Sequence, residues 1–194
     1  FLDFLNQFIT EDRVAIQDKV LADRTRYITA VVEDIYQPHN ASAVIRTCDC
    51  FGIQDLHIIE NRNKYKVNPK VALGSGQWVN IIKHKKEANN SLSCIDQLKS
   101  KGYKIVATTP HTDKSIYDLE LNEPIALVFG NEKEGISDII KDNADELVKI
   151  PMYGFTESFN ISVSAALCMS LLIEKLRKTD IQWQLSDQEK LILN

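Results

Sequence analysis

The stretch TAVVEDIYQPHNASAVIRTCDCFG, residues 29–52, joins a short apolar run to a segment of helical periodicity. Residues 29–32 are mostly small or β-branched and predict a buried strand. Residues 41–51 place apolar side chains at helical spacing and predict a helix, which Gly52 is positioned to end. A strand that leads directly into a helix is the opening half of a βαβ unit, so the stretch favours an α/β fold.

The same alternation of apolar runs and helical segments continues through the chain. Because the apolar runs are almost continuous, we expect a parallel sheet with helices on both faces. The expected strands are residues 29–32, 56–59, 79–82, 104–108, 125–129 and 147–150. The expected helices between them are residues 41–51, 91–100, 137–144 and 161–178.

Helices are also expected at both ends of the chain. Apolar residues recur at helical spacing within residues 1–9, and Thr10 can cap a second helix that runs to about Ala22. Ser186 and Glu189 form a capping-box pattern, which predicts a final helix. The sequence therefore divides into a helical N-terminal extension (1–26), a central sheet domain (27–178) and a helical C-terminal extension (179–194).

The composition allows one sizeable core, since 44% of the 194 residues are hydrophobic and 26% are charged. No apolar run approaches the roughly 20 residues that a membrane-spanning helix needs. Residues 1–8 lack the basic region and the cleavage site of a signal peptide. The four cysteines show no metal-binding spacing, so we expect reduced thiols, no metal and a cytoplasmic protein.

The net charge of −4 is unusual for a protein that binds nucleic acid, because phosphate contacts normally need a basic surface. Lysine and arginine nevertheless cluster in residues 13–26, 64–70, 83–86 and 175–178, whereas acidic residues concentrate in 113–146. Local basic clusters can bind RNA, but they are also common on faces that contact only solvent. Charge alone therefore leaves the partner undecided.

The helix expected from residue 161 is apolar on most of its surface as far as residue 173. A helix of this kind is buried on all sides, either in the core of its own chain or against a second copy. We favour a homodimer interface, with a single-chain core as the alternative.

The run IALVFGNEKEGIS, residues 125–137, leads from a strand through a glycine-flanked turn into a helix. It approaches the phosphate-binding pattern GxxxxGK[ST], but Ile136 stands where that pattern has lysine. Glu132 and Glu134 would also repel a triphosphate. The turn therefore suits a neutral or cationic ligand, such as a sulfonium that carries adenosine, unless its glycines serve only the backbone geometry.

Two further runs carry polar groups beside predicted strands. In the first, we expect Asn40 to cap the helix that contains Arg46, whose guanidinium can bind a phosphate through two hydrogen bonds. The alternative is an intrahelical ion pair between Arg46 and Asp49. In the second run, PMYGFTESFNIS (151–162), Ser158 or Asn160 can cap the next helix, and free amides in this loop would suit an adenine or a ribose.

Together, the helix with Asn40 and Arg46, the run FGNEKEG (129–135) and the run IPMYGFTESFN (150–160) resemble the three motifs of the SpoU (SPOUT) RNA 2′-O-methyltransferases. They occur in the order of that family. The resemblance implies an α/β fold whose C-terminal part forms a deep trefoil knot, a rare exception to the un-knotted rule. It also implies S-adenosyl-methionine as the cofactor and an obligate homodimer.

Within the family, PHN at residues 38–40 and the helical N-terminal segment resemble the TrmH group, which methylates the ribose of a guanosine in the tRNA D-loop. The resemblance implies a catalytic set of Arg46, Asn40, Glu132, Ser158 and Asn160. The implied cofactor contacts are Thr108, Gly130, Ile150 and Phe159, and the implied substrate contacts are His39, Arg24, Lys175 and Arg177. The alternatives are an rRNA or tRNA wobble-position methyltransferase of the same fold and a non-catalytic RNA-binding protein.

Overall fold

The computed structural model describes residues 10–66 and 68–193, so the helix expected within residues 1–9 lies outside the described part. A six-stranded, entirely parallel sheet forms the centre of the molecule, in the order β3-β2-β1-β5-β4-β6. Its strands are β1 (Ile28–Glu33), β2 (Asp55–Ile59), β3 (Asn80–His84), β4 (Lys104–Thr108), β5 (Ile125–Phe129) and β6 (Glu146–Val148). The α/β fold and the parallel sheet predicted from the sequence are confirmed.

Two of the predicted strands end two residues away from the predicted position, β3 later and β6 earlier. β3 runs on to His84 because it keeps its register with β2 as far as the pair Ile59–His84. β6 ends at Val148 because it pairs with β4 only from Glu146 to Val148, after which the chain leaves the sheet. Both strands lie at the edges of the sheet, where a single neighbour decides how far the strand extends.

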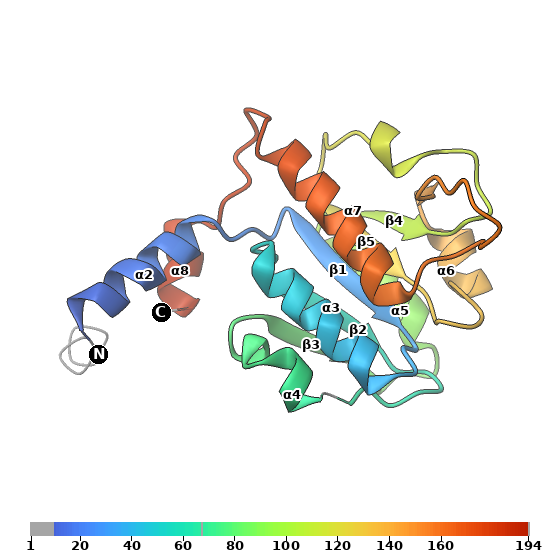
Figure 1. Ribbon diagram of the computed structural model, residues 1–194, viewed down its shortest axis with the longest axis horizontal. Helices are drawn as coiled ribbons and strands as arrows, with labels where there is room; N and C mark the ends of the chain where they lie inside the picture. The colour runs from blue at the N-terminus through green and yellow to red at the C-terminus, as the bar shows by residue number, and fades with distance from the viewer. Residues whose placement is uncertain (1–9, 67, 194) are drawn as a thin grey trace.

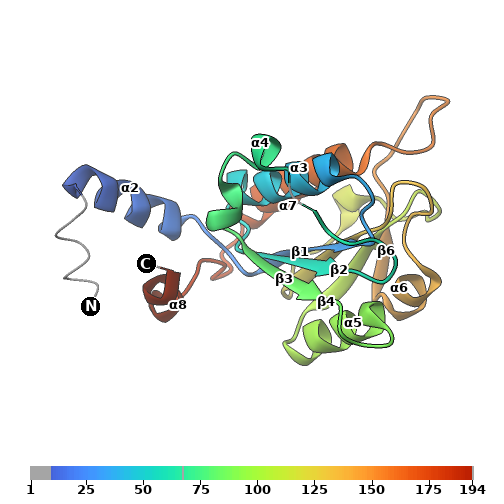
Figure 2. The ribbon, with the colours of Figure 1, turned by 90° about the horizontal axis from the view of Figure 1, so that it is seen from below.

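Helices cover both faces of the sheet (Figure 2). On one face lie α3 (Pro38–Cys50), α4 (Pro69–Ala72) and α7 (Ile161–Leu176), and on the other lie α5 (Asn90–Ser100) and α6 (Asp138–Asn143). Because side chains alternate along a strand, Val32 packs in the core under α3 and α7, whereas Val31 packs in the core under α5 and α6. Two short 3₁₀ helices, Ser75–Gln77 and Ile116–Asp118, complete the connections.

The direction of the chain reverses between β1 and β5, which are hydrogen-bonded neighbours as far as the pair Val32–Phe129. From β1 the chain crosses one face of the sheet through α3 and reaches β2, toward one edge of the sheet. From β5 it crosses the opposite face through α6 and reaches β6, toward the opposite edge. Loops that leave adjacent strands in opposite directions open a crevice at the carboxyl ends of those strands. The functional site is therefore expected beyond Glu33 and Phe129.

Helices α2 (Glu11–Ala22) and α8 (Asp187–Leu193) lie at the same end of the molecule, outside its layered part (Figures 1 and 2). Arg26 bonds to Glu189 of α8 at 2.6 Å and to Asp55 of β2 at 2.9 Å, which ties α8 to the sheet. The predicted capping box is confirmed, since the Glu189 carboxylate accepts from the Ser186 amide at 2.8 Å and the Ser186 hydroxyl accepts from the Glu189 amide. Among the described helices, none has the length and apolar character needed to cross a membrane.

The ends of α3 both confirm and correct the sequence-based predictions. Gly52 ends the helix with φ +71°, and the Ile53 amide donates to the Cys48 carbonyl at 2.9 Å. The prediction that Asn40 caps the helix is wrong, because α3 begins at Pro38, two residues before Asn40, and its N-cap position is Gln37. The fixed φ of proline suits the first helical position, which places Asn40 inside the first turn.

Candidate active site

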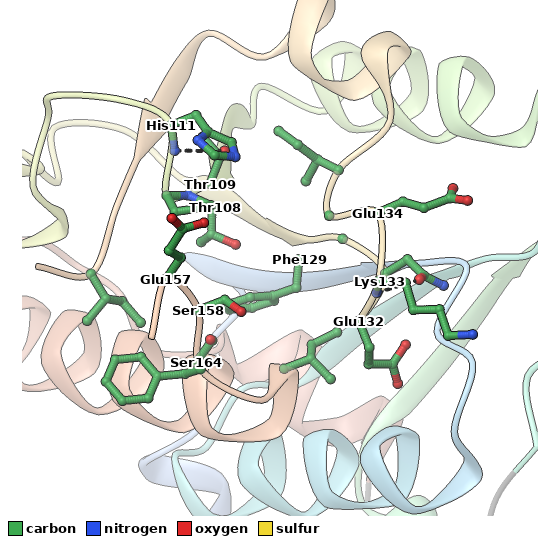
Figure 3. Close-up of a pocket in the computed structure, with 18 of the residues that line it drawn as sticks. Thr108, Thr109, His111, Phe129, Glu132, Lys133, Glu134, Glu157, Ser158 and Ser164 are labelled. Atoms are coloured by element: carbon green, nitrogen blue, oxygen red, sulfur yellow. Dashed lines mark hydrogen bonds between the residues drawn. The ribbon is translucent and has the colours of Figure 1, made fainter. Parts of the chain in front are cut away.

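A pocket of about 410 Å³ lies at the carboxyl edge of the sheet, between the loops that follow β4, β5 and β6 (Figure 3). All four residues predicted to contact the cofactor line it, namely Thr108, Gly130, Ile150 and Phe159. Glu132 and Ser158 of the predicted catalytic set line it as well. Three loops that are separate in the sequence therefore contribute to one cavity, and the loops after β5 and β6 carry two of the runs that the sequence analysis singled out.

The loop after β5 is folded back so tightly that only glycine fits at position 130. A Cβ atom on Gly130 would lie 2.0 Å from the backbone carbon of Gly135 and 2.1 Å from the backbone nitrogen of Ile136. Asn131 and Gly135 hold this turn through two backbone hydrogen bonds of 2.8 and 2.9 Å. The backbone geometry alone thus requires Gly130, and the turn presents its outer side to the pocket.

The pocket combines an apolar floor with an acidic rim. The apolar floor includes Phe129, Ile136, Val148, Ile150 and Ile161. The lining also contains four carboxylates (Glu132, Glu134, Asp138 and Glu157) and two amines (Lys133 and Lys141). An excess of negative charge over an apolar floor suits a ligand with a flat apolar part and a positive charge, and disfavours a triphosphate.

A chain of side-chain hydrogen bonds connects the three predicted motifs. The Asn40 side-chain amide donates to Glu132 Oε1 at 2.8 Å, and the Asn160 side-chain amide donates to Asn40 Oδ1 at 3.2 Å. Asn160 Oδ1 in turn accepts from the Ser162 amide at 2.9 Å and caps α7, which confirms the capping role predicted for Asn160. An ionised carboxylate can only accept hydrogen bonds. Glu132 therefore fixes the orientation of both side-chain amides in this chain, so that each NH₂ group donates toward Glu132.

Glu132 is further bound by the backbone just before α3. The amides of Tyr36 and Gln37 donate to its two carboxylate oxygens at 3.0 and 3.2 Å. Partial burial raises the pKa of Glu132, but the hydrogen bonds from Asn40 and from these two amides outweigh it, so the pKa lies below its ordinary value. The carboxylate therefore stays charged near the positive end of the α3 dipole, where a negative charge is favourable.

Arg46 lies on the exposed surface of α3, about 9 Å along the helix axis from Asn40. The alternative of an ion pair with Asp49 is not realised, since the Asp49 carboxylate accepts instead from Arg24 at 3.0 Å. Among the residues that the structure describes, Arg46 has no hydrogen bond or ion pair, so its guanidinium is free to meet a ligand from outside.

Comparison with known proteins agrees with this geometry. Residues 27–170 match the model of the SpoU rRNA methylase family. The chain belongs to this family. The resemblance inferred from the three motifs is thereby confirmed.

Curated members of the SpoU family resemble the chain over most of its length. The tRNA (guanosine(18)-2′-O)-methyltransferase of Borreliella burgdorferi is 47% identical over 187 residues, which cover 96% of this chain and 84% of that protein. The enzyme of the same name from Thermus thermophilus is 32% identical over 82% of this chain and 81% of its own. The crystal structure of the A. aeolicus TrmH/SpoU tRNA-modifying enzyme superposes with a TM-score of 0.83 at 30% identity, covering 94% of this chain and 93% of that chain.

The residues predicted to bind substrate in this SpoU family member are not gathered at the pocket. His39 is exposed on the first turn of α3, next to Asn40. Arg24, in contrast, is only 2% exposed, and its guanidinium donates to the Gln54 and Asp49 side chains and to the Trp78 carbonyl. The donors of this buried arginine are occupied within the chain, and the structure does not bring Arg24 to the pocket, so its contact with substrate stays a prediction.

Lys175 and Arg177 lie at the far end of α7, about 24 Å along the helix from the Asn160 cap. Lys175 Nζ donates to the Leu119 carbonyl at 2.6 Å. Arg177 bonds to the Asp23 carboxylate at 2.9 Å and lies over the Trp183 ring at 4.9 Å. Both side chains thus have partners within the chain, and the structure does not bring them to the pocket.

Asp34 is a residue of the site that the sequence analysis missed. It follows β1 in a left-handed conformation (φ +49°), and its carboxylate accepts from three successive amides, those of residues 61–63. Its carbonyl accepts from the Asn63 side chain at 2.8 Å and from the Asn131 side chain at 2.6 Å. Asp34 thereby connects the loops after β1, β2 and β5, and an acidic residue directly after a strand was the available signal.

A buried group of metal-ligand type lies away from the pocket, on β2, β3 and α5. The ring nitrogens of His57 and His84 are 3.0 Å apart, and the ligand atoms of these residues and Cys94 lie within 4.8 Å of one another. Burial, followed by the charges of His84 and Lys101, lowers the pKa of His57 to about 3. The pair is therefore neutral and each imidazole serves the other as its hydrogen-bond partner.

Proposed function

We propose that this protein transfers a methyl group from S-adenosyl-methionine to the 2′-hydroxyl of a ribose in RNA, and that its substrate is a guanosine in the D-loop of tRNA. The observation that carries the proposal is the hydrogen-bonded chain Glu132–Asn40–Asn160. It connects the three SpoU motifs beside a pocket of suitable size and charge. The names of the Borreliella and Thermus relatives support the choice of tRNA guanosine.

The pocket fits the proposed cofactor. The apolar floor, with Ile150 and Phe159, would hold the adenine, and the turn after Gly130 would hold the ribose and the amino-acid tail through backbone groups. The acidic rim would favour the positive charge of the sulfonium, which is the electrophilic methyl donor that the cofactor supplies. AviRb from Streptomyces viridochromogenes, a protein of the same fold (TM-score 0.70, 21% identity), has been crystallised with AdoMet.

Arg46 is proposed to bind the RNA phosphate beside the target ribose. An arginine side chain stays protonated in proteins, so it supplies charge and a two-pronged hydrogen-bond donor and not a base. The Glu132–Asn40 bond fixes the first turn of α3 and thereby the position of the helix that carries Arg46. Ser158, which lines the pocket with a hydroxyl group, is the proposed neighbour of the reacting 2′-oxygen.

We also propose a homodimer and a C-terminal trefoil knot. The outer side of α7 exposes Val163 and Leu167 to 43% and 45%, and Phe159 just before the helix to 43%, which supports this side as an interaction surface. The proposal of a knot is supported by backbone hydrogen bonds that join the segment after β6 to the loop after β4. Replacing Leu167 by Asp tests the dimer: light scattering should detect monomers, and an unchanged mass would contradict the interface.

The division into an N-terminal extension (1–26), a methyltransferase domain (27–178) and a C-terminal extension (179–194) is kept as a proposal. It is supported by the family match to residues 27–170. A cytoplasmic location is proposed as well, because Cys48, Cys50, Cys94 and Cys168 are all free thiols. A metal ion has no proposed part in the reaction.

The direct test is incubation with methyl-labelled cofactor and bulk tRNA, followed by mapping of the labelled nucleoside. We expect a 2′-O-methylguanosine in the D-loop. Label in rRNA but in no tRNA would contradict the substrate, and label at the wobble position would contradict the site. Calorimetry that shows no binding of S-adenosyl-methionine would contradict catalysis and favour a non-catalytic RNA-binding protein.

A further inference from the structure

The acidic net charge of −4 raises the question of which surface could receive RNA. The segment between β2 and α4, of which the structure describes residues 60–66 and 68, and the start of α4 carry three exposed lysines: Lys64, Lys66 and Lys70. Within residues 10–66 and 68–193 none of the three has an ion-pair partner. The three lysines lie within seven residues of one another, so the segment gathers positive charge that no carboxylate neutralises through an ion pair among the described residues.

The conformation of this segment points its lysines outward. Residues alternate along it: Asn63 and Tyr65 are turned inward, whereas Lys64 and Lys66 are exposed. Asn63 Nδ2 donates to the Asp34 carbonyl at 2.8 Å, and the Tyr65 ring is 6% exposed. This is the alternation of an extended chain, in which every second side chain lies on one side, about 7 Å apart.

The segment is held at both of its ends, at one by the residue that follows β1 and at the other by α3. At one end, the Asp34 carboxylate accepts from the amides of residues 61–63. At the other, the Asn68 amide donates to the Ser42 hydroxyl at 2.7 Å. The segment therefore follows the N-terminal half of α3, the helix that also exposes His39 and Arg46 (Figure 1).

We propose that Lys64, Lys66 and Lys70, which we call the lysine strip, bind the phosphate backbone of the RNA substrate next to the target nucleotide. This inference rests on the proposed function and assigns its docking surface. Neutralising phosphates releases counterions, which is the main source of affinity for a protein of otherwise unfavourable charge. Because the segment is already fixed to α3, little backbone entropy is lost when the RNA binds.

Arg62 is not part of the lysine strip. Its guanidinium bonds to the Glu134 carboxylate at 2.6 Å, and both side chains are exposed. The pair connects the start of the segment to the loop after β5, which lines the pocket. The pair therefore lies between the lysine strip and the pocket.

The test measures the binding of a tRNA transcript by fluorescence anisotropy as a function of salt, using the whole protein. The double variant Lys64→Gln/Lys66→Gln should lower the slope of log affinity against log salt by about 1.4 to 1.8, and adding Lys70→Gln should bring the loss to about 2 to 3. For the triple variant, raising the salt from about 50 to 200 mM should then cost about 20- to 40-fold less affinity than it costs the wild type.

The matched control is Lys19→Gln/Lys101→Gln, which removes two exposed lysines that also have no ion pair among the described residues, one on α2 and one just after α5. Its slope should equal that of the wild type. An unchanged slope in the strip variants, or an equal loss in the control, would overturn the proposal. Thermal unfolding of all variants checks that they are folded.

A second readout separates docking from chemistry. If the wild type methylates tRNA, the strip variants should raise KM for tRNA and leave kcat within about twofold at saturating RNA. A fall in kcat with an unchanged salt slope would overturn the lysine strip but leave the proposed function intact. Wild-type protein that binds no RNA would overturn both, whereas binding that depends on the strip without any methyl transfer would overturn only the proposed function.

Discussion

The Asn40 side-chain amide donates to the Glu132 carboxylate at 2.8 Å, although the two residues are 92 positions apart in the sequence. Asn40 lies in the first turn of α3, after β1, and Glu132 lies in the loop after β5. These two strands are neighbours in the sheet. The bond therefore spans the point at which the chain reverses direction and holds together the two sides of the crevice.

Replacing Glu132 by Gln should weaken this arrangement. One of the two oxygens becomes an NH₂ group, which cannot accept from Asn40 or from the amides of Tyr36 and Gln37. We expect a loss of about 1–3 kcal/mol in unfolding free energy, measured by urea denaturation, and a fall of about 100-fold in methyl transfer. Glu87→Gln is the control, since Glu87 is exposed and does not line the pocket. Equal effects of the two variants would contradict the role of Glu132.

Replacing Arg46 by Ala should separate catalysis from stability. The side chain is exposed and unbonded among the described residues, so the unfolding free energy should stay within about 0.5 kcal/mol of the wild type. Methyl transfer should fall by about 100-fold or more, while calorimetry should find the affinity for S-adenosyl-methionine nearly unchanged. Arg46→Lys keeps the charge but loses the planar fork and should recover only part of the activity. Loss of cofactor binding together with activity would argue against a role in RNA contact.

Replacing Gly130 by Ala should disrupt the loop after β5, because the new Cβ would overlap the backbone at Gly135 and Ile136. We expect a loss of about 3 kcal/mol in unfolding free energy, together with loss of cofactor affinity. Gly76→Ala is the matched control, since the nearest atom to its Cβ would be 3.9 Å away. Thermal unfolding and calorimetry measure both effects, and a Gly130→Ala protein that behaves like the control would refute the tight turn.

The His57–His84 pair predicts how stability changes with acid. Burial lowers the pKa of His57 from 6.5 to about 3, so the folded state holds this ring neutral while the unfolded state takes up a proton. The contribution of the neutral His57 ring to the unfolding free energy is fully present above pH 6.5. It is lost as the pH falls from there toward 3, by up to about 1.4 kcal/mol per pH unit. His57→Gln cannot titrate, so urea denaturation should give a shallower acid dependence.

Local patterns were sufficient to predict the main elements. Apolar periodicity reports which face of each element is buried, and this is a property of neighbouring residues. Gly52 was correctly predicted to end α3, because a left-handed φ is a local requirement. Asn40 was wrongly predicted as a cap, since Pro38 offered a competing start for the helix and the amide of Asn40 found a partner outside it.

The lysines and arginines show where the sequence was insufficient. Arg24, Lys175 and Arg177 were predicted to bind substrate, yet Arg24 is buried and the other two bond to groups of their own chain. The local sequence around a lysine or arginine can be the same whether its side chain binds RNA, a carboxylate or a carbonyl. Its partner is decided by segments far away in the chain, which no local pattern contains.

The sequence by itself determined the order of strands and helices, the need for glycine at the turns and the residue types of the three motifs. Only the tertiary structure decided that Asn40 meets both Glu132 and Asn160, at sequence separations of 92 and 120. The physical reason is the strand order β1-β5-β4-β6, which brings the carboxyl ends of these strands to one edge. Hydrophobic burial forms the sheet, and the position of each strand within it selects which polar groups find each other.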